Sequence, residues 1–156
     1  MQIDKKIAIV TGASSGLGAA ISTALIENGA RVYGLARNKY ALDKLRKILG
    51  ENFISVELDI SEDKAVTDWV SKTFSVQCRP DILINNAGIG SFGKIDEIST
   101  DEWLAMVNTN LNGMYYLTSR MVPFMKQKID TIKSKLGPGK TTWIPSSEKR
   151  FVWMNL

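Results

Sequence analysis

A glycine- and serine-rich segment at residues 11–18 has the composition and the setting of a phosphate-binding turn. It reads Thr-Gly-Ala-Ser-Ser-Gly-Leu-Gly, follows a short apolar run and precedes apolar residues at helical spacing. The first N–H groups of a helix lack partners, so a glycine turn that opens a helix can hold an anion. We expect Gly12 to permit the turn, Gly16 to admit a pyrophosphate, and Gly18 to pack helix on strand. A glycine turn without a ligand is the plainer alternative.

The end of the second expected strand carries the next candidate for binding chemistry. An acid at this place would bond a ribose 2′-OH, whereas an arginine can pair with a 2′-phosphate. Ala36 occupies the place of the acid and Arg37 follows it. The pattern therefore favours a 2′-phosphorylated dinucleotide, with a solvated surface arginine as the alternative.

Alternating signals predict the elements that position these residues. Strands are expected over 6–10, 31–36, 53–58 and 81–85, with helices over 19–27 and 62–74. Another helix between strands two and three should place Leu42, Leu45, Ile48 and Leu49 on one side and end at Gly50. The alternation predicts one domain over 1–156 with an α/β, Rossmann-type, doubly wound parallel sheet between two helix layers.

The second half of the chain is expected to be mainly helical. Ser99 or Thr100 can cap a helix that runs to Met125, with Pro123 bending or ending it unless neighbouring groups compensate. The lysine-rich segment 126–136 reads as a solvated extension of this helix, or less simply as a membrane-surface or partner-binding helix. Residues 141–145 form the candidate for a fifth strand, after which the pattern ends.

Composition excludes several kinds of function. The 156 residues include 20 Lys and Arg against 16 Asp and Glu, an excess too small and too dispersed to indicate nucleic-acid binding. They hold no histidine and one cysteine, so we expect no metal site and no Ser/His or Cys/His nucleophile. The single cysteine fits a reducing compartment and a cytoplasmic location. No apolar run is long enough for a membrane helix.

Two motifs together resemble a known family. The Gly-x-x-x-Gly-x-Gly spacing of the turn and the later Asn85-Asn86-Ala87-Gly88 segment are similar to the two signatures of short-chain dehydrogenases/reductases. Asp59 and the segment 108–113 add matches, and the resemblance covers about residues 5–125, with 126–156 divergent.

The resemblance implies a dinucleotide site that prefers NADP to NAD. In the family, the turn binds the pyrophosphate and ribose, the residue at Asp59 contacts the adenine amino group, and the residue at Asn86 lies near the ribose. Asn85 is expected to be structural, with its amide bonding backbone across strands. An aspartate that caps the following turn is the alternative for Asp59. The expected cofactor-binding residues are Gly12, Ser14, Ser15, Gly16, Leu17, Gly18, Arg37, Asp59, Asn86, Ala87 and Gly88.

The resemblance also implies hydride transfer between NADP(H) and a small-molecule carbonyl or alcohol, using a Tyr, a Lys, a Ser and an Asn. Asn110 matches the Asn, though a polar residue that bends or caps the helix would look the same. Ser147 matches the Ser, because it follows the fifth strand candidate.

No Tyr-x-x-x-Lys pair stands in the family's place, about a dozen residues after that Ser. Tyr40 and Lys44 have the spacing but belong to the adenosine end of the site. We therefore expect cofactor binding with little turnover, from a fragment, an isoform or a divergent member; a non-catalytic dinucleotide-binding or regulatory protein is the alternative. The resemblance further implies a homo-oligomer through the helix at 100–125, at Met106, Tyr115 and Leu117.

Overall fold

Strands and helices alternate along most of the chain. The computed structural model describes residues 3–75, 78–136 and 152–155. The elements are β1 (Ile7–Thr11), α1 (Gly16–Glu27), β2 (Arg31–Ala36), α2 (Lys39–Leu49), β3 (Phe53–Glu57), α3 (Asp63–Thr73), β4 (Ile82–Asn85), α4 (Thr100–Val107), a π-helical segment η1 (Asn108–Gly113), α5 (Met114–Leu136) and β5 (Val152–Asn155).

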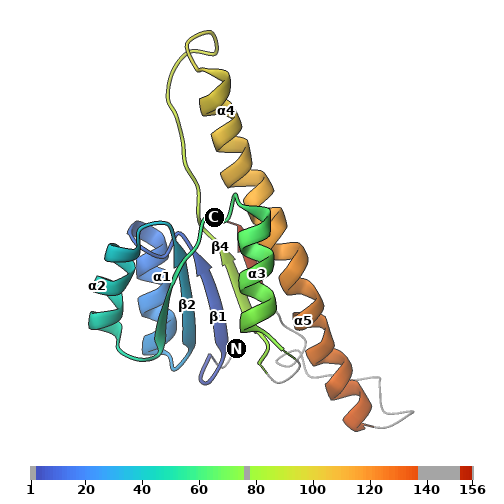
Figure 1. Cartoon of the computed structure of the whole chain (residues 1–156). Helices are drawn as coiled ribbons and strands as arrows, with labels where there is room; N and C mark the ends of the chain where they lie inside the picture. Colours follow the sequence, from blue (N-terminus) through green and yellow to red (C-terminus); the bar gives the residue numbers. More distant parts are fainter. Residues whose placement is uncertain (1–2, 76–77, 137–151, 156) are drawn as a thin grey trace.

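The strands form one parallel sheet in the order β3-β2-β1-β4-β5. Helices α1 and α2 cover one face, and α3 and α5 cover the other (Figure 1). The order of strands reverses between β1 and β4, and a crevice is expected where parallel strands diverge in this way. The Rossmann-type doubly wound fold predicted from the sequence is confirmed.

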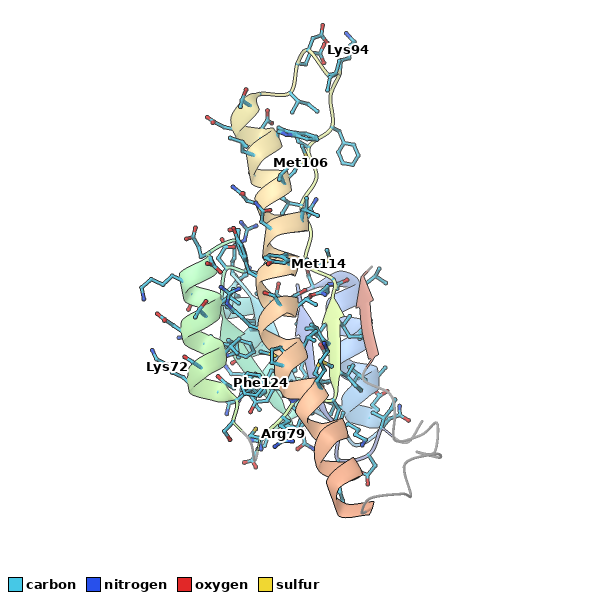
Figure 2. All side chains as sticks on the ribbon, turned by 90° about the vertical axis from the view of Figure 1, so that its right-hand side faces the viewer. Lys72, Arg79, Lys94, Met106, Met114 and Phe124 are labelled. Atoms are coloured by element: carbon cyan, nitrogen blue, oxygen red, sulfur yellow. The ribbon has the colours of Figure 1, made fainter. Side chains whose placement is uncertain are left out.

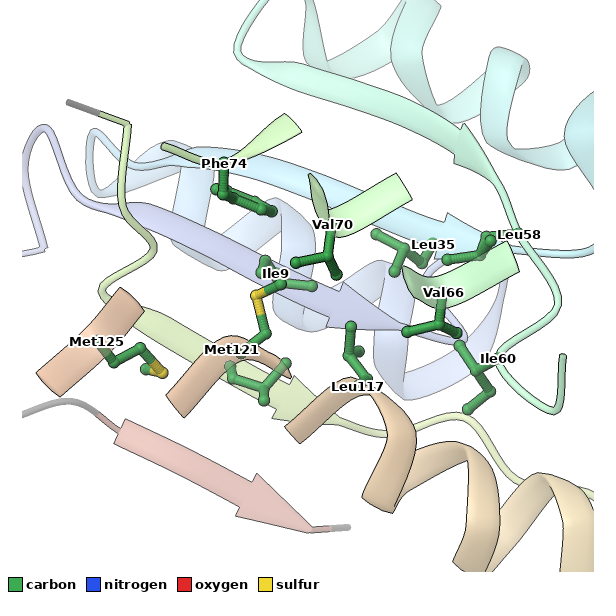
Figure 3. Packing of buried hydrophobic residues seen from close by; sticks show 11 residues of the cluster. Ile9, Leu35, Leu58, Ile60, Val66, Val70, Phe74, Leu117, Met121 and Met125 are labelled. Atoms are coloured by element: carbon green, nitrogen blue, oxygen red, sulfur yellow. The ribbon is translucent and has the colours of Figure 1, made fainter. Parts of the chain in front are cut away.

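Strand β1 shows why both faces of the sheet need cover. Ala8 and Val10 point into the apolar cluster on the α1 and α2 side, whereas Ile9 points into the cluster under α3 and α5. All three side chains are fully buried. Such a strand, apolar on both sides, is stable only between two layers. Figure 3 shows the second cluster, in which α5 contributes Leu117, Met121 and Met125.

Helix α2 differs in one residue from the expected apolar face. Leu42 is fully buried, and Leu45 and Leu49 pack against the same cluster, but 78% of Ile48 is exposed. At about 100° per residue, Ile48 lies roughly 120° around the helix from Leu42. The expectation for Ile48 was therefore wrong, because its spacing to Leu45 does not bring it over the sheet.

The long helix predicted from residue 100 is one rod made of α4, η1 and α5. Its α4 end projects beyond the sheet with the preceding loop, and we call residues 89–107 the arm (Figure 1). Figure 2 shows Lys94 and Met106 on the arm and Met114 where the rod reaches the sheet. Among the described residues, no helix has the length and apolarity to cross a membrane.

Pro123 neither ends nor divides this rod, contrary to the simpler expectation. Helix α5 continues through Pro123 to Leu136. Pro123 and Ser119, whose carbonyl loses its helical partner, are both exposed, so water can bond that carbonyl. Met121 and Met125 are buried against the sheet on either side of the proline. Packing on one face and solvent on the other thus compensate for the missing N–H.

Leu117 does not belong to an outer surface of the rod. Its side chain is fully buried in the cluster under α3 and α5, so it cannot contact a second subunit. Tyr115, in contrast, is 65% exposed. The expectation of an interface residue was wrong for Leu117, because two positions along a helix turn the side chain by about 200°.

The described fifth strand lies later in the chain than the sequence candidate. It is Val152–Asn155, which pairs with β4 and places Asn155 opposite Asn85. Residues 141–145 are outside the described part of the chain, so a strand there stays a prediction.

Arg120 joins helix α5 to helix α3. Its Nε donates to Thr67 Oγ1 at 2.6 Å, its Nη1 donates to the Tyr116 carbonyl at 2.9 Å, and its Nη2 pairs with Asp63. The arginine side chain is 27% exposed. Planar guanidinium groups hold several acceptors in fixed geometry, so this contact sets how α3 lies against the rod.

Replacing Arg120 by Ala should lower the free energy of unfolding by about 1 to 2 kcal/mol, because charge-assisted bonds between two helices are lost. Urea unfolding followed by circular dichroism measures the change. Lys64→Ala is the matched control, since Lys64 pairs with Asp68 within one helix at 88% exposure. Equal stability of the two variants would contradict the role of Arg120.

Candidate functional site

A pocket of about 330 Å³ lies at the carboxyl ends of the strands. Its walls come from the turn after β1, from the ends of β2 and β3, from the segment after β4, and from η1. The lining residues are Gly12, Ser14, Ser15, Leu35, Ala36, Arg37, Asn38, Leu58, Asp59, Ile60, Asn86, Ala87, Gly88, Ile89 and Thr109. Its position at the reversal of strand order is the usual place for a ligand in this architecture.

The turn between β1 and α1 keeps its backbone exposed at one point and closely packed at another. Gly16 has φ of +53°, and no atom lies within 4 Å of the place a Cβ would take. A Cβ on Gly18 would collide with the Gly12 carbonyl and with the Asn86 amide nitrogen. Gly18 therefore serves close packing of the start of α1, but its neighbours are the turn at Gly12 and the Asn86 side chain.

The start of α1 is arranged to receive an anion. Ser15 is the N-cap residue, but its side chain makes no capping hydrogen bond. The first N–H groups of the helix consequently lack this partner, and the helix dipole favours negative charge at the same end. Ser14 and Ser15 line the pocket, whereas Leu17 is 68% exposed and, like Gly16 and Gly18, is not among the lining residues.

The Thr11 hydroxyl connects the ends of β1 and β4. Its Oγ1 accepts hydrogen bonds from the backbone N–H groups of Asn86 and Ala87, both at 2.9 Å, and donates to the Ile84 carbonyl at 3.4 Å. Thr11 is fully buried. A hydroxyl has one donor and two acceptor sites, so all three are used. Thr11 fixes the Asn86-Ala87-Gly88 wall of the pocket.

Asn85, the last residue of β4, and Asn86, which follows it, make different contacts, and the bond to backbone across strands that was expected of Asn85 is made by Asn86. The Asn86 side chain donates from Nδ2 to the Thr11 carbonyl at 3.0 Å and to the Gly12 carbonyl at 3.4 Å. The Asn85 side chain donates to Thr118 Oγ1 of α5 at 3.1 Å. Asn85 thus bonds a helix and Asn86 bonds backbone across strands, because successive side chains of a strand point to opposite faces.

Opposite charges meet at the far end of the pocket. Arg37 Nη1 lies 3.9 Å from Asp59 Oδ2, with 62% of the arginine and 34% of the aspartate side chain exposed. Asp59 Oδ1 accepts from the backbone N–H of Ser61 at 3.0 Å and from its hydroxyl at 2.7 Å. Asp59 therefore stabilises the turn before α3, as the plainer interpretation held, while its other oxygen faces the pocket residue Arg37.

Asn110 lies in η1, and its side chain forms two hydrogen bonds with the chain after β4. Its Oδ1 accepts from Ile89 N at 2.9 Å, and its Nδ2 donates to the Ile89 carbonyl at 2.8 Å. The π-helical turn includes one residue more than an α-turn, and such segments are frequent at functional sites. Gly113, at its end, is buried against Ile60. Asn110 therefore positions the loop behind the pocket, and its catalytic role stays a prediction.

Glu102 fastens the loop of the arm to α4. One carboxylate oxygen accepts from the Ser91 hydroxyl at 3.0 Å, and the other accepts from the Ser99 N–H at 2.9 Å in a capping box. Hydrogen bonds from the Ser99 backbone and hydroxyl, then from Ser91, hold the pKa of Glu102 below its usual value. Met106 Sδ adds a contact to Ser91 N at 3.3 Å.

Tyr40 and Lys44 lie on α2, the helix after the second strand in which the sequence placed them. The Lys44 ammonium lies 4.5 Å from the centre of the Tyr40 ring, and Tyr40 is 70% exposed. Neither residue lines the pocket. A cation over a ring face is a local attraction between positions one helical turn apart.

Several pocket residues were not anticipated, and one candidate falls outside the described chain. The residues missed as pocket lining are Leu35, Asn38, Leu58, Ile60, Ile89 and Thr109, and the part of Thr11 in holding the wall was missed as well. All of these except Thr109, which lies in η1, stand at or shortly after the carboxyl end of a strand. This place was the available signal, because parallel strands expose their carboxyl ends together. Ser147 lies outside the described residues, so its catalytic role stays a prediction.

Thr11→Val should destabilise the fold by about 1 to 3 kcal/mol, because a side chain of the same shape leaves two backbone N–H groups unpaired. Thr11→Ser keeps the hydroxyl and should retain most of the stability. Urea denaturation of both variants gives the comparison. A valine variant as stable as the serine variant would show that the hydroxyl does not hold this wall.

Comparison with known proteins gives the family. The family model for short chain dehydrogenase matches residues 6–137. A 3-oxoacyl-acyl-carrier-protein reductase of Vibrio harveyi is 36% identical over 82% of this chain and 52% of its own length. An NADP-dependent 3-hydroxy acid dehydrogenase of Escherichia coli strain K12 is 31% identical over 78% of this chain and 50% of its own length.

Solved structures agree with the sequence comparison. A 3-ketoacyl-(acyl-carrier-protein) reductase from Brucella melitensis, complexed with NADH, superposes with a TM-score of 0.78 at 29% identity, over 83% of this chain and 54% of that one. A serine dehydrogenase complexed with NADP+ gives 0.73 at 31% identity, over 78% and 49%. The chain spans about half the length of the relatives it matches. With the turn, the strand order and these matches in agreement, the chain belongs to the short-chain dehydrogenase family.

Proposed function

We propose that the chain binds NADP as part of an oxidoreductase that interconverts a small-molecule carbonyl and an alcohol. The observation that carries the cofactor choice is Arg37 at the wall of the pocket, with Ala36 where an acid would repel a 2′-phosphate. The NADP-dependent relative from Escherichia coli and the NADP+ complex support the choice. The NADH complex keeps NAD as the weaker alternative.

The residues of the pocket fit such a cofactor. The turn with Gly12, Ser14 and Ser15 would hold the pyrophosphate at the start of α1. Arg37 would pair with the 2′-phosphate, and Asp59 would lie beside the adenine. The wall of Asn86, Ala87 and Gly88 would lie beside the ribose. The nicotinamide of the bound cofactor would supply the hydride.

The described residues supply a cofactor site but little of the proton-transfer machinery. A tyrosine with an ordinary pKa near ~10 needs a nearby cation before its phenolate forms at neutral pH. Among the described residues, Tyr40 has Lys44 beside its ring, but both lie on α2 and neither lines the pocket. We therefore propose binding of NADP with little turnover by these 156 residues.

Titration with NADPH and NADH by nicotinamide fluorescence should show tighter binding of NADPH and no oxidation on adding ketones or quinones. Arg37→Asp should weaken NADPH at least about tenfold more than NADH, since a charge-assisted bond to phosphate becomes a repulsion. Lys47→Asp on the following helix, α2, makes the same change of charge outside the pocket and should leave the ratio unaltered. If Arg37→Asp lowered the affinities for NADPH and NADH equally, the NADP assignment would be wrong.

The outer surface of the rod supports self-association. Leu104, Leu111 and Tyr115 are 47%, 57% and 65% exposed, at spacings that return to similar sides of a helix. Large apolar side chains in such a row are typical of contact surfaces. We propose that two copies associate here, through these residues and not through Leu117.

Sedimentation at micromolar concentration should give at least a dimer mass, and Leu111→Glu together with Tyr115→Glu should give a monomer, because buried carboxylates would lie unpaired in the interface. Leu17→Glu, which changes an equally exposed apolar residue elsewhere, is the control. A monomer mass for the unaltered chain would refute the association.

A further inference from the structure

The adenosine end of the pocket holds a cation and an anion side by side. Arg37 and Asp59 both line the pocket, and their charged groups approach to 3.9 Å between Nη1 and Oδ2. This separation is too long for a direct hydrogen bond, so the guanidinium is not tied to the carboxylate. A ligand phosphate at Arg37 would nevertheless experience both charges.

The position of the Asp59 carboxylate is fixed by its own turn. Oδ1 accepts from the N–H and the hydroxyl of Ser61, at 3.0 Å and 2.7 Å. With one oxygen held in this way, the other stays directed toward Arg37 and cannot swing away without breaking both bonds. The carboxylate is therefore held beside Arg37, at the place where a 2′-phosphate would bind.

Coulomb attraction between Arg37 and a phosphate is offset by repulsion from Asp59. A 2′-hydroxyl carries no charge and experiences neither effect strongly. An adenine contact made by Asp59, as the family resemblance implies, would change the affinity for both kinds of ligand by the same factor. The effect of Asp59 on the ratio of affinities is thus separate from any contact with adenine.

We propose that Asp59 limits the selectivity that Arg37 provides, so that the pair, and not the arginine alone, sets how strongly 2′-phosphorylated ligands are preferred. This inference rests on the proposed nucleotide-binding function. The two side chains are 62% and 34% exposed, so solvent and salt reduce the effect of Asp59 to a few-fold change in the ratio.

Adenosine 2′,5′-bisphosphate and adenosine 5′-monophosphate test this inference, because they carry only the adenosine half and differ only in the 2′-phosphate. Calorimetric titration gives selectivity as the ratio of the two dissociation constants. Asp59→Asn, which keeps an oxygen for Ser61, should raise the preference for the bisphosphate about two- to fivefold at low salt. The gain should shrink as salt screens the charges.

Two further variants test whether the change in selectivity depends on the Arg37 and Asp59 pair. In an Arg37→Gln background with Asp59 intact, the bisphosphate should bind more weakly than the monophosphate, because only the repulsion remains. Glu62→Gln removes an exposed negative charge three residues away and outside the pocket, and it should leave the ratio unchanged. A rise with Glu62→Gln equal to that with Asp59→Asn would mean a general field effect and overturn the proposal.

The remaining outcomes separate this inference from the proposed function. A ratio that stays constant in Asp59→Asn, with both affinities changed equally, would leave Asp59 as an adenine contact only. A lower ratio would mean that Asp59 orients Arg37 for the phosphate. Either result overturns the inference while cofactor binding stands. If the unaltered chain binds neither nucleotide, the proposed function fails together with it.

Discussion

The pocket depends on three hydrogen bonds of one side chain, the hydroxyl of Thr11. The strand order reverses between β1 and β4, and there the chain leaves the sheet in two directions. Backbone groups at such a point lose their ladder partners and must be paired in some other way. Thr11 supplies that pairing for Asn86 and Ala87, and the Asn86 amide then bonds back to the turn. The hydrogen bonds of Thr11 and Asn86 join the ends of β1 and β4, and the space beside these ends stays open as the pocket.

The helical rod has two functions along its length. Its α5 part is sheet cover, with Leu117, Met121 and Met125 buried against the strands and Arg120 bonded to α3. Its α4 part extends into solvent, and hydrogen bonds of Glu102 within the arm hold the loop against it. The π-helical turn lies between the two, where Asn110 grips Ile89 behind the pocket. Along the rod, apolar packing against the sheet is therefore replaced by side-chain hydrogen bonds at the level of the pocket.

The electrostatics of the pocket follow from the same frame. The uncapped start of α1 favours phosphate at one end of the pocket, while Arg37 and Asp59 bring opposite charges to the other. Membership of the short-chain dehydrogenase family accounts for the turn and for the strand order. The family match covers residues 6–137, and the part of the chain that matches the relatives spans about half of their length.

Much of the fold was predictable because its signals are local. Four strands and the helices between them follow from runs and periodicities that neighbouring residues create, and β2 has the predicted bounds. The glycine turn is contiguous in sequence, so its conformation could be anticipated at Gly12, Gly16 and Gly18. The segment Asn86-Ala87-Gly88, which forms a wall of the pocket, is also contiguous in sequence.

Contacts between distant residues were decided only by the tertiary structure. The Asn86 amide bonds the backbone of β1 and the Asn85 amide bonds Thr118 of α5, because the side to which each points depends on the sheet. Pro123 stayed within a helix because burial on one side outweighs a lost bond on the other, and β5 formed at 152–155, where pairing with β4 is available. The sequence by itself determined which segments become strands, helices and a phosphate-binding turn, since these depend on neighbours along the chain. Partners, exposure and the meeting of Arg37 with Asp59 depend on neighbours in space, which only the folded chain defines.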